Sequence, residues 1–157
     1  VVVGSLLRDR GLLLGLAESC TGGLLAGRMT SIPGSSDYFY GGVVSYSVDA
    51  KADWLGVPRA VLDEFGPVSE PLANEMAIRA RDAAGGPGKA IGAAITGIAG
   101  PAGGTEEMPV GTVFLGVADQ AGVLVKQHKF TGDRERVRAL AAQLTLELIR
   151  RRLLGLL

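Results

Sequence analysis

The sequence contains only one cysteine, Cys20, and one histidine, His128, among its 157 residues. A single cysteine cannot form an intramolecular disulfide, and one Cys with one His falls short of the four ligands of a usual structural zinc site. We therefore expect a chain without a metal or other cofactor, whose chemistry depends on other side chains. For His128, which lies far along the chain from the polar turns described below, we expect a surface or packing role.

The sequence also lacks an excess of charge of either sign. Sixteen Lys and Arg residues balance sixteen Asp and Glu residues, without a local block of one sign. The basic patch typical of nucleic-acid and anionic-membrane binders is therefore missing. No apolar run approaches the ~18 residues of a membrane span, and the N-terminal segment lacks the features of a signal peptide. We expect a cytoplasmic homo-oligomer with a small-molecule partner, no nucleic acid and no membrane.

Apolar residues are abundant, at 47%, and so is glycine, with 24 residues. The length and the apolar content fit one compact domain over residues 1–157. The glycines cluster at 22–23, 41–42, 85–86 and 97–104 without a repeat, which excludes collagen-like and solenoid architectures. Glycine clusters between apolar runs indicate tight turns or places where the backbone approaches a ligand closely.

Hydrophobic periodicity predicts alternating helices and strands. We expect strands at 12–17, 39–46, 89–96, 110–118 and 123–130, and helices at 1–9, 24–31, 49–55, 58–65, 70–84 and from 133 onward. Buried strands that alternate with helices predict an α/β fold, a three-layer α/β/α sandwich. The last two strands are joined by a tight turn and form an antiparallel hairpin before a closing helix. One strand of a mixed, mostly parallel sheet therefore runs against its neighbours.

Three polar turns follow the first three predicted strands, and in such sheets ligands bind beyond the carboxyl ends of the strands. In the first turn, AESCTGG, Ser19 presents a hydroxyl group. The amides of Thr21, Gly22 and Gly23 form a positive helix end suited to an oxyanion or a phosphate. The ordinary alternative for Ser19 is that its side chain only caps the helix, as Ser and Thr commonly do.

Two neighbours of Ser19 keep other interpretations open. Glu18 fits either a catalytic acid or base or a residue that ties down the turn. Cys20 is a rival nucleophile, because a thiolate at a helix N-terminus is activated.

The second turn, SYSVDAK, contains Lys51 near the start of a short helix, where the helix dipole and burial would lower its pKa and allow it to act as a base. The alternative is a solvated lysine. Tyr46 supplies a second hydroxyl at the strand end, or ordinary packing, and Ser47 is a local rival to Ser19 because it lies four residues before Lys51.

The third turn, TGIAGPAGGTEEMP, is rich in glycine and follows a buried strand. It contains Gly97, Gly100, Gly103, Gly104 and Thr105. Such spacing lets backbone amides face an anion, but the pattern is neither a Walker loop nor a dinucleotide fingerprint. A flexible crossover is the alternative.

The chain closely resembles the competence-damage-inducible CinA C-terminal domain family over nearly its whole length. The resemblance rests on four segments: LAESCTGGLLAGRMTSIPGSSDYFYGGVVSYSVDAK, LDEFGPVSEPLA, AITGIAGPAGGTEEMPVGTVFLG and FTGDRERVR. It implies an α/β/α sandwich with a mixed five-stranded sheet. It also implies the activity of a bacterial nicotinamide mononucleotide (NMN) deamidase, which hydrolyses the nicotinamide amide to nicotinic acid mononucleotide and ammonia without a metal.

The resemblance implies roles for the residues of the three turns. Ser19 would attack the amide carbon, neutral Lys51 would accept the serine proton and return it to ammonia, and Tyr46 would orient or relay. The amides of the Thr21–Gly23 turn would hold the oxyanion. The 97–105 loop and Arg134 would hold the ribose phosphate. A non-catalytic nucleotide-binding or regulatory module linked to competence is the alternative function.

Overall fold

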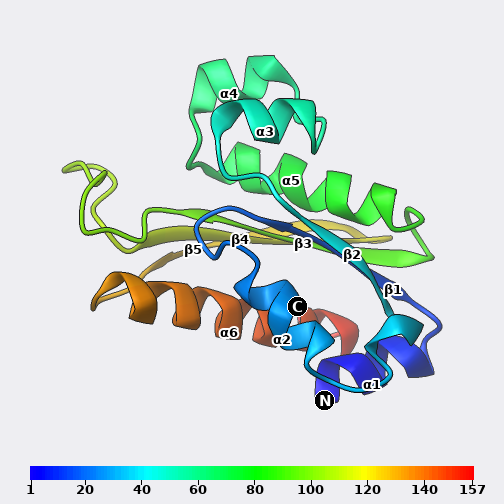
Figure 1. The fold of residues 1–157 in the computed structure, drawn as a ribbon. Coiled ribbons are helices and arrows are strands. Elements are labelled where there is room, and N and C mark those ends of the chain that lie inside the picture. The colour runs from blue at the N-terminus through cyan, green and yellow to red at the C-terminus, as the bar shows by residue number, and fades with distance from the viewer.

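The computed structural model describes residues 1–157 and contains one five-stranded sheet between two helical layers (Figure 1). The strand order is β2-β1-β3-β4-β5. β1 pairs in parallel with β2 and β3, whereas β4 is antiparallel to both of its neighbours. The strands are β1 Leu13–Glu18, β2 Phe39–Val44, β3 Ala90–Gly97, β4 Thr112–Asp119 and β5 Gly122–Lys129. The predicted α/β sandwich, with one strand reversed, is confirmed.

The helices divide between the two faces of the sheet, as Figure 1 shows. One face carries α1 (Val2–Asp9), α2 (Leu24–Thr30) and the long α6 (Arg134–Leu153). The other face carries α5 (Glu70–Ala83), with α3 (Val48–Asp53) and α4 (Arg59–Phe65) above it; a short 3₁₀ turn spans Ser35–Asp37. Each layer buries its own apolar cluster against the sheet. None of the helices combines the length and the apolar character that crossing a bilayer requires.

Local sequence signals explain where the two longest helices begin. The Ser69 hydroxyl accepts a hydrogen bond from the Leu72 amide at the start of α5, and the Asp133 carboxylate accepts one from the Arg136 amide at the start of α6. Side-chain oxygens at these positions satisfy amides that have no partner inside the helix. α6 ends with arginines at positions 150–152, the charge that a helix C-terminus favours.

Three glycines on neighbouring strands allow α5 to lie directly on the sheet. Gly15 of β1 and Gly92 of β3 are partners in the parallel register, and Gly116 lies on β4. A Cβ atom at Gly15 or Gly92 would overlap a backbone carbonyl oxygen of α5, that of Ala80 or Ala77. The prediction that the glycine clusters serve turns or ligands did not anticipate this use of glycine inside strands.

The second predicted strand is shorter than expected, and the difference shapes the site. β2 ends at Val44 rather than at Tyr46, so Ser45 and Tyr46 leave the sheet. Their carbonyl oxygens are therefore free to accept hydrogen bonds from a side chain, and both accept one from Lys51.

Candidate active site

The turns that follow β1, β2 and β3 meet at one end of the sheet and enclose a cavity of about 240 Å³. Seven of the predicted site residues line it, together with Cys20 and parts of two loops. The lining consists of Ser19, Cys20, Tyr46, Lys51, Pro67, Val68, Gly97, Ile98, Ala99, Gly100, Ala102, Gly103 and Arg134. Five predicted residues do not line it: Thr21, Gly22, Gly23, Gly104 and Thr105.

Ser19 is held by its backbone at the carboxyl end of β1. Its amide donates to the carbonyl oxygen of Ile95 at 3.0 Å, and its carbonyl oxygen accepts from the Gly22 amide at 2.9 Å. The side chain is buried, with 7% of the residue exposed. The Ser19 hydroxyl is therefore held at the carboxyl end of β1, where its hydrogen-bond partner is Lys51.

Lys51 reaches Ser19 from α3, 32 residues further along the chain. Its Nζ lies 3.0 Å from Ser19 Oγ, 2.9 Å from the carbonyl oxygen of Ser45 and 3.0 Å from that of Tyr46. Only 1% of the residue is exposed, so the solvated-lysine alternative is wrong. No carboxylate forms an ion pair with this ammonium group.

Burial lowers the pKa of Lys51 from its ordinary 10.5 to about 8. The cause is desolvation, which penalises the charged form of a buried amine. The expected contribution from a helix start is wrong, because α3 has six residues and Lys51 lies in its last turn, where a helix dipole favours a cation. The lowered pKa itself agrees with the sequence prediction.

Ser47 caps a helix and does not pair with Lys51. Its hydroxyl accepts a hydrogen bond from the Ala50 amide at 3.0 Å and caps α3. Ser47 does not line the cavity, and Lys51 Nζ contacts Ser19 instead. The geometry therefore favours Ser19 over Ser47 as the partner of Lys51.

Cys20 lines the cavity but has a thiol that resists ionisation. Burial raises its pKa from 9.0 to about 11, although Lys51, Arg134 and Arg138 act in the opposite direction. A thiolate is the nucleophilic form of cysteine. The expectation that the helix start activates Cys20 is therefore wrong in direction.

Glu18 fixes the turn that follows it, residues 19–23. Its carboxylate accepts hydrogen bonds from the amides of Gly23 and Leu25 at 3.1 Å and of Ala26 at 2.7 Å, and 2% of the residue is exposed. Of the two interpretations of Glu18, the structural one holds, because the carboxylate is occupied by the first turn of α2.

The same contacts change which amides are free to face an oxyanion. The Gly23 amide donates to Glu18 and the Gly22 amide to the carbonyl oxygen of Ser19, so the expectation for these two amides is wrong. The amides of Cys20 and Thr21 donate no hydrogen bond to a backbone carbonyl oxygen. They are the free donors that directly follow Ser19.

Arg134 joins two sides of the cavity. Its Nη1 donates to the carbonyl oxygen of Gly100 at 2.7 Å, and its Nη2 donates to the Tyr46 hydroxyl at 2.9 Å. The Tyr46 side chain thus faces Arg134, while its carbonyl oxygen holds Lys51. Tyr46 orients Lys51 through its backbone, and its hydroxyl makes no contact with Ser19 or Lys51 that would relay a proton.

The glycine-rich loop lines the cavity over only part of its length. Gly97, Gly100 and Gly103 lie at the cavity, whereas Thr105 turns back on itself by pairing its backbone and hydroxyl with Met108. Gly104 packs against the Val110 backbone. The amides of Ala99, Gly100, Ala102 and Gly103 have no partner in the chain, and all four residues line the cavity.

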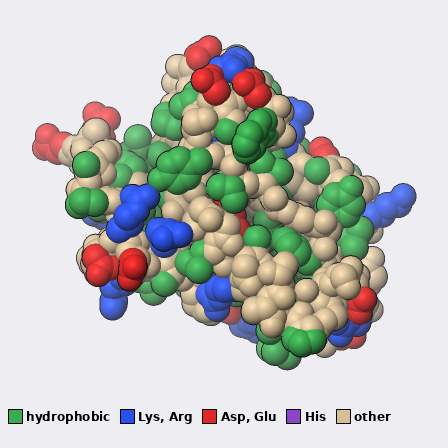
Figure 2. All heavy atoms as spheres, in the orientation of Figure 1, with side chains coloured by type: hydrophobic (Ala, Val, Ile, Leu, Met, Phe, Trp, Pro, Cys, Tyr) green, Lys and Arg blue, Asp and Glu red, His purple; other side chains and the backbone are tan.

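The cavity is electropositive. Lys51 and Arg134 line it, and no Asp or Glu does. In Figure 2 basic side chains lie above the first turns of α6, with acidic side chains directly below them. No three His, Cys, Asp or Glu side chains come together anywhere in the chain as metal ligands. Free amides and uncompensated cations favour an anionic ligand.

Comparison with known proteins decides the family. Residues 1–153 match the family described as the CinA C-terminal domain. The chain belongs to that family. This confirms the resemblance inferred from the sequence segments.

Similar proteins cover this CinA domain almost completely. A CinA-like protein from Geobacter metallireducens is 53% identical over 153 residues, which are 98% of this chain and 36% of that protein. A solved CinA superfamily protein from Klebsiella pneumoniae has a TM-score of 0.91 at 34% identity and covers 98% of this chain and 94% of its own. The protein CihA from Agrobacterium tumefaciens has a TM-score of 0.85 at 37% identity, covering 95% and 94%. The chain thus spans about a third of the length of the curated relatives that it matches.

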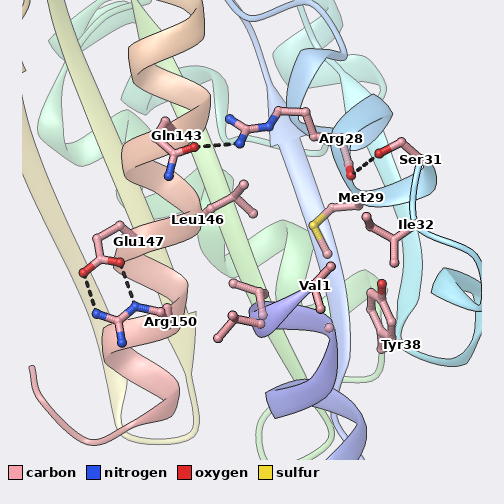
Figure 3. A pocket seen from close by; sticks show the side chains of 13 residues that line it. Val1, Arg28, Met29, Ser31, Ile32, Tyr38, Gln143, Leu146, Glu147 and Arg150 are labelled. Carbon is pink, nitrogen blue, oxygen red and sulfur yellow. Dashed lines mark hydrogen bonds and ion pairs between the residues drawn. The ribbon is translucent and has the colours of Figure 1, made fainter.

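A larger cavity of the CinA domain, of about 400 Å³, lies between α1, α2 and α6 (Figure 3). Apolar side chains such as Met29, Ile32 and Leu146 line it, and its polar side chains are engaged with each other: Arg28 donates to Gln143, and Arg150 forms an ion pair with Glu147. It contains neither Ser19 nor Lys51. The larger cavity therefore lacks the predicted site residues, which gather in the smaller one.

The sequence analysis missed two parts of the smaller cavity. Pro67 and Val68 form one wall, held in place because the Thr96 hydroxyl donates to the Pro67 carbonyl oxygen at 2.7 Å. The carbonyl of Ser45, which accepts from Lys51, was also missed. No side-chain signal marks a backbone acceptor, whereas the polar Thr96 at the end of a buried strand was a usable sign.

Proposed function

We propose that this CinA domain hydrolyses the amide of NMN to nicotinic acid mononucleotide and ammonia, with Ser19 as nucleophile and Lys51 as general base. The observation that carries the proposal is the 3.0 Å contact between Ser19 Oγ and Lys51 Nζ, in a cavity that no Asp or Glu side chain lines. A weakly acidic hydroxyl needs an adjacent base to become a nucleophile. The named substrate comes from the family resemblance, and the positive charge of the cavity agrees with a nucleotide.

The surroundings of Lys51 suit a neutral amine. A neutral amine has two N–H groups and one lone pair, and two carbonyl oxygens, those of Ser45 and Tyr46, are available for the two N–H groups. Lys51 Nζ donates to Ser19 Oγ at 3.0 Å when the amine is charged. Once the amine is neutral, its lone pair is left for this neighbour, and the Ser19 hydroxyl donates to it instead. This arrangement prepares proton transfer from Ser19 Oγ to Lys51 Nζ.

The reaction follows in two halves. Ser19 Oγ attacks the amide carbon as its proton passes to Lys51, and the carbonyl oxygen becomes an oxyanion beside the free amide of Cys20, which lines the cavity. Lys51 then gives the proton to the leaving nitrogen, ammonia departs, and an ester with Ser19 remains. Water, deprotonated by Lys51, attacks the ester carbon, and the proton returns to Ser19 as the acid is released.

The phosphate end of the substrate fits the other side of the cavity. Arg134 and the unpartnered amides of Ala99, Gly100 and Gly103 offer donors to an anion there. Guanidinium and amide groups are common phosphate ligands. Thr105 and Gly104 lie outside this set.

The experiment is ammonia release by the purified protein incubated with NMN, with nicotinic acid mononucleotide followed by chromatography in the same samples. We expect both products in equal amounts, with many turnovers per molecule. Nicotinamide riboside, which lacks the phosphate, is the matched control substrate and should have a higher KM. Calorimetric binding of NMN without product would instead favour the alternative, a nucleotide-binding or regulatory module.

A further inference from the structure

Arg138 of α6 contacts the backbone of the nucleophile turn. Its Nη2 donates to the carbonyl oxygen of Thr21 at 2.8 Å. The guanidinium also lies over Gly22, where a Cβ atom would be 3.6 Å from Nη2. No carboxylate forms an ion pair with Arg138, so its charge is directed at the turn without compensation.

The Arg138 side chain extends from a part of α6 that is packed tightly against the sheet. Its neighbours Val137, Ala141 and Ala142 are fully buried in the apolar cluster between α6 and the sheet. Arg138 does not line the cavity, unlike Arg134 one turn earlier. Arg138 therefore acts on the turn and does not touch a ligand in the cavity.

Hydrogen bonds fix the backbone carbonyl groups on both sides of the Cys20–Thr21 peptide. The Gly22 amide fixes the carbonyl of Ser19, and that carbonyl shares a peptide plane with the Cys20 amide. Arg138 and the Leu24 amide fix the carbonyl of Thr21, on the other side of the Cys20–Thr21 peptide. The Cys20–Thr21 peptide group lies between these two anchors, so the conformation of the turn that presents the Cys20 amide at the cavity depends on both.

We propose that Arg138 is a positioning residue that holds the turn in the conformation in which the Cys20 amide faces the oxyanion formed on the substrate. This inference rests on the proposed amide hydrolysis. The positive charge of Arg138 also stabilises the negative charge that develops on the substrate oxygen beside the turn. Preorganised donors act most strongly on such a developing charge. Arg138 matters more in the transition state than in the substrate complex, because the carbonyl oxygen gains charge only then.

The test compares Arg138→Gln and Arg138→Lys with the wild-type protein in NMN hydrolysis. We expect Arg138→Gln to lower kcat by at least about tenfold with KM nearly unchanged, less than the ~100-fold or greater loss that follows removal of an oxyanion donor itself. Arg138→Lys keeps the charge, so its kcat should lie between that of the wild type and that of Arg138→Gln. Arg151→Gln, an exposed arginine near the end of the same helix, should behave like the wild type.

Chemical rescue separates positioning from general stability. Millimolar guanidinium chloride, well below denaturing concentrations, should restore part of the kcat of Arg138→Ala and leave the wild type unaffected. Unchanged kcat in Arg138→Gln would overturn the inference, and so would a higher KM at normal kcat, which is the sign of a substrate ligand. Failure of the wild-type protein to release ammonia would instead refute the proposed function.

Discussion

Lys51 Nζ has as many hydrogen-bond acceptors around it as an ammonium group has protons, yet it lacks a carboxylate to neutralise it. Such a site holds the charged amine by dipoles alone, and desolvation shifts the balance toward the neutral form. With a pKa of about 8, about one molecule in ten carries a neutral Lys51 at pH 7. At the ordinary pKa of 10.5 the neutral fraction would be over a hundred times smaller.

The rate should therefore rise with pH through the pKa of Lys51. Below that pKa the amine is protonated and has no lone pair for Ser19, so kcat/KM is expected to increase as pH rises and to level off above about 8. Lys51→Arg should lose at least ~100-fold, because a guanidinium keeps its proton. Initial rates between pH 6 and 10 are the measurement. Near-normal turnover of Lys51→Arg would make Lys51 an electrostatic anchor and leave the base unidentified.

Cys20 should be dispensable for catalysis. Its buried thiol, with a pKa near 11, is almost entirely protonated at pH 8, and Cys20→Ser keeps a small side chain in the same place. We expect most of the activity to remain in Cys20→Ser, measured by ammonia release. We also expect the Cys20 thiol of the wild type to react only slowly with iodoacetamide at pH 8. Fast alkylation that abolishes activity and is blocked by NMN would transfer the role of nucleophile to Cys20.

At the scale of elements, the site depends on two helices, α2 and α3, that lie on opposite faces of the sheet. The Glu18 side chain binds the first turn of α2 on one face of the sheet, and Ser19 meets Lys51 of α3 on the other. Successive residues of an extended chain point to opposite faces. Adjacent residues therefore serve different helices: Glu18 fixes the turn on one face, and Ser19 contacts Lys51 on the other.

Glu18→Gln should destabilise the fold. The substitution keeps one acceptor oxygen but places an NH₂ group among three amide donors, of Gly23, Leu25 and Ala26. We expect a loss of about 2 kcal/mol in the free energy of unfolding, measured by urea denaturation. Glu64→Gln, an exposed glutamate of α4, is the control and should change little. Equal stability of the two variants would show that the cap contributes less than its geometry implies.

The contact between α5 and the sheet leads to a second prediction at this scale. Gly92→Ala places a methyl group against the Ala77 carbonyl of α5, so α5 must move away from the sheet. We expect the free energy of unfolding to fall by about 2 kcal/mol or more. Gly27→Ala in α2 has open space around the new methyl group and should instead stabilise the helix by up to ~1 kcal/mol. Urea denaturation of both variants measures the contrast, which a loss of stability in Gly27→Ala would contradict.

At the scale of the whole molecule, the sequence predicted the layers and the meeting of three turns, because parallel strands bring their carboxyl ends to one edge. It left open which side chains meet there. From the residues alone Ser19 could equally cap a helix, and only the fold brings it to Lys51, 32 residues away. Family resemblance selected this pair before the geometry was known. It did not reveal that Glu18 occupies the Gly23 amide, because a buried carboxylate and a catalytic one look alike in sequence.

The most direct test of the Ser19 and Lys51 assignment is ammonia release from NMN by Ser19→Ala and Ser47→Ala, measured side by side with the wild type at pH 8.5. Both variants lose one hydroxyl, but only Ser19 Oγ contacts Lys51 Nζ, whereas the Ser47 hydroxyl caps α3. We predict at least a ~1000-fold loss of kcat in Ser19→Ala with unchanged circular dichroism, and near-normal turnover in Ser47→Ala. Wild-type turnover in Ser19→Ala, or loss of activity confined to a folded Ser47→Ala, would contradict the assignment.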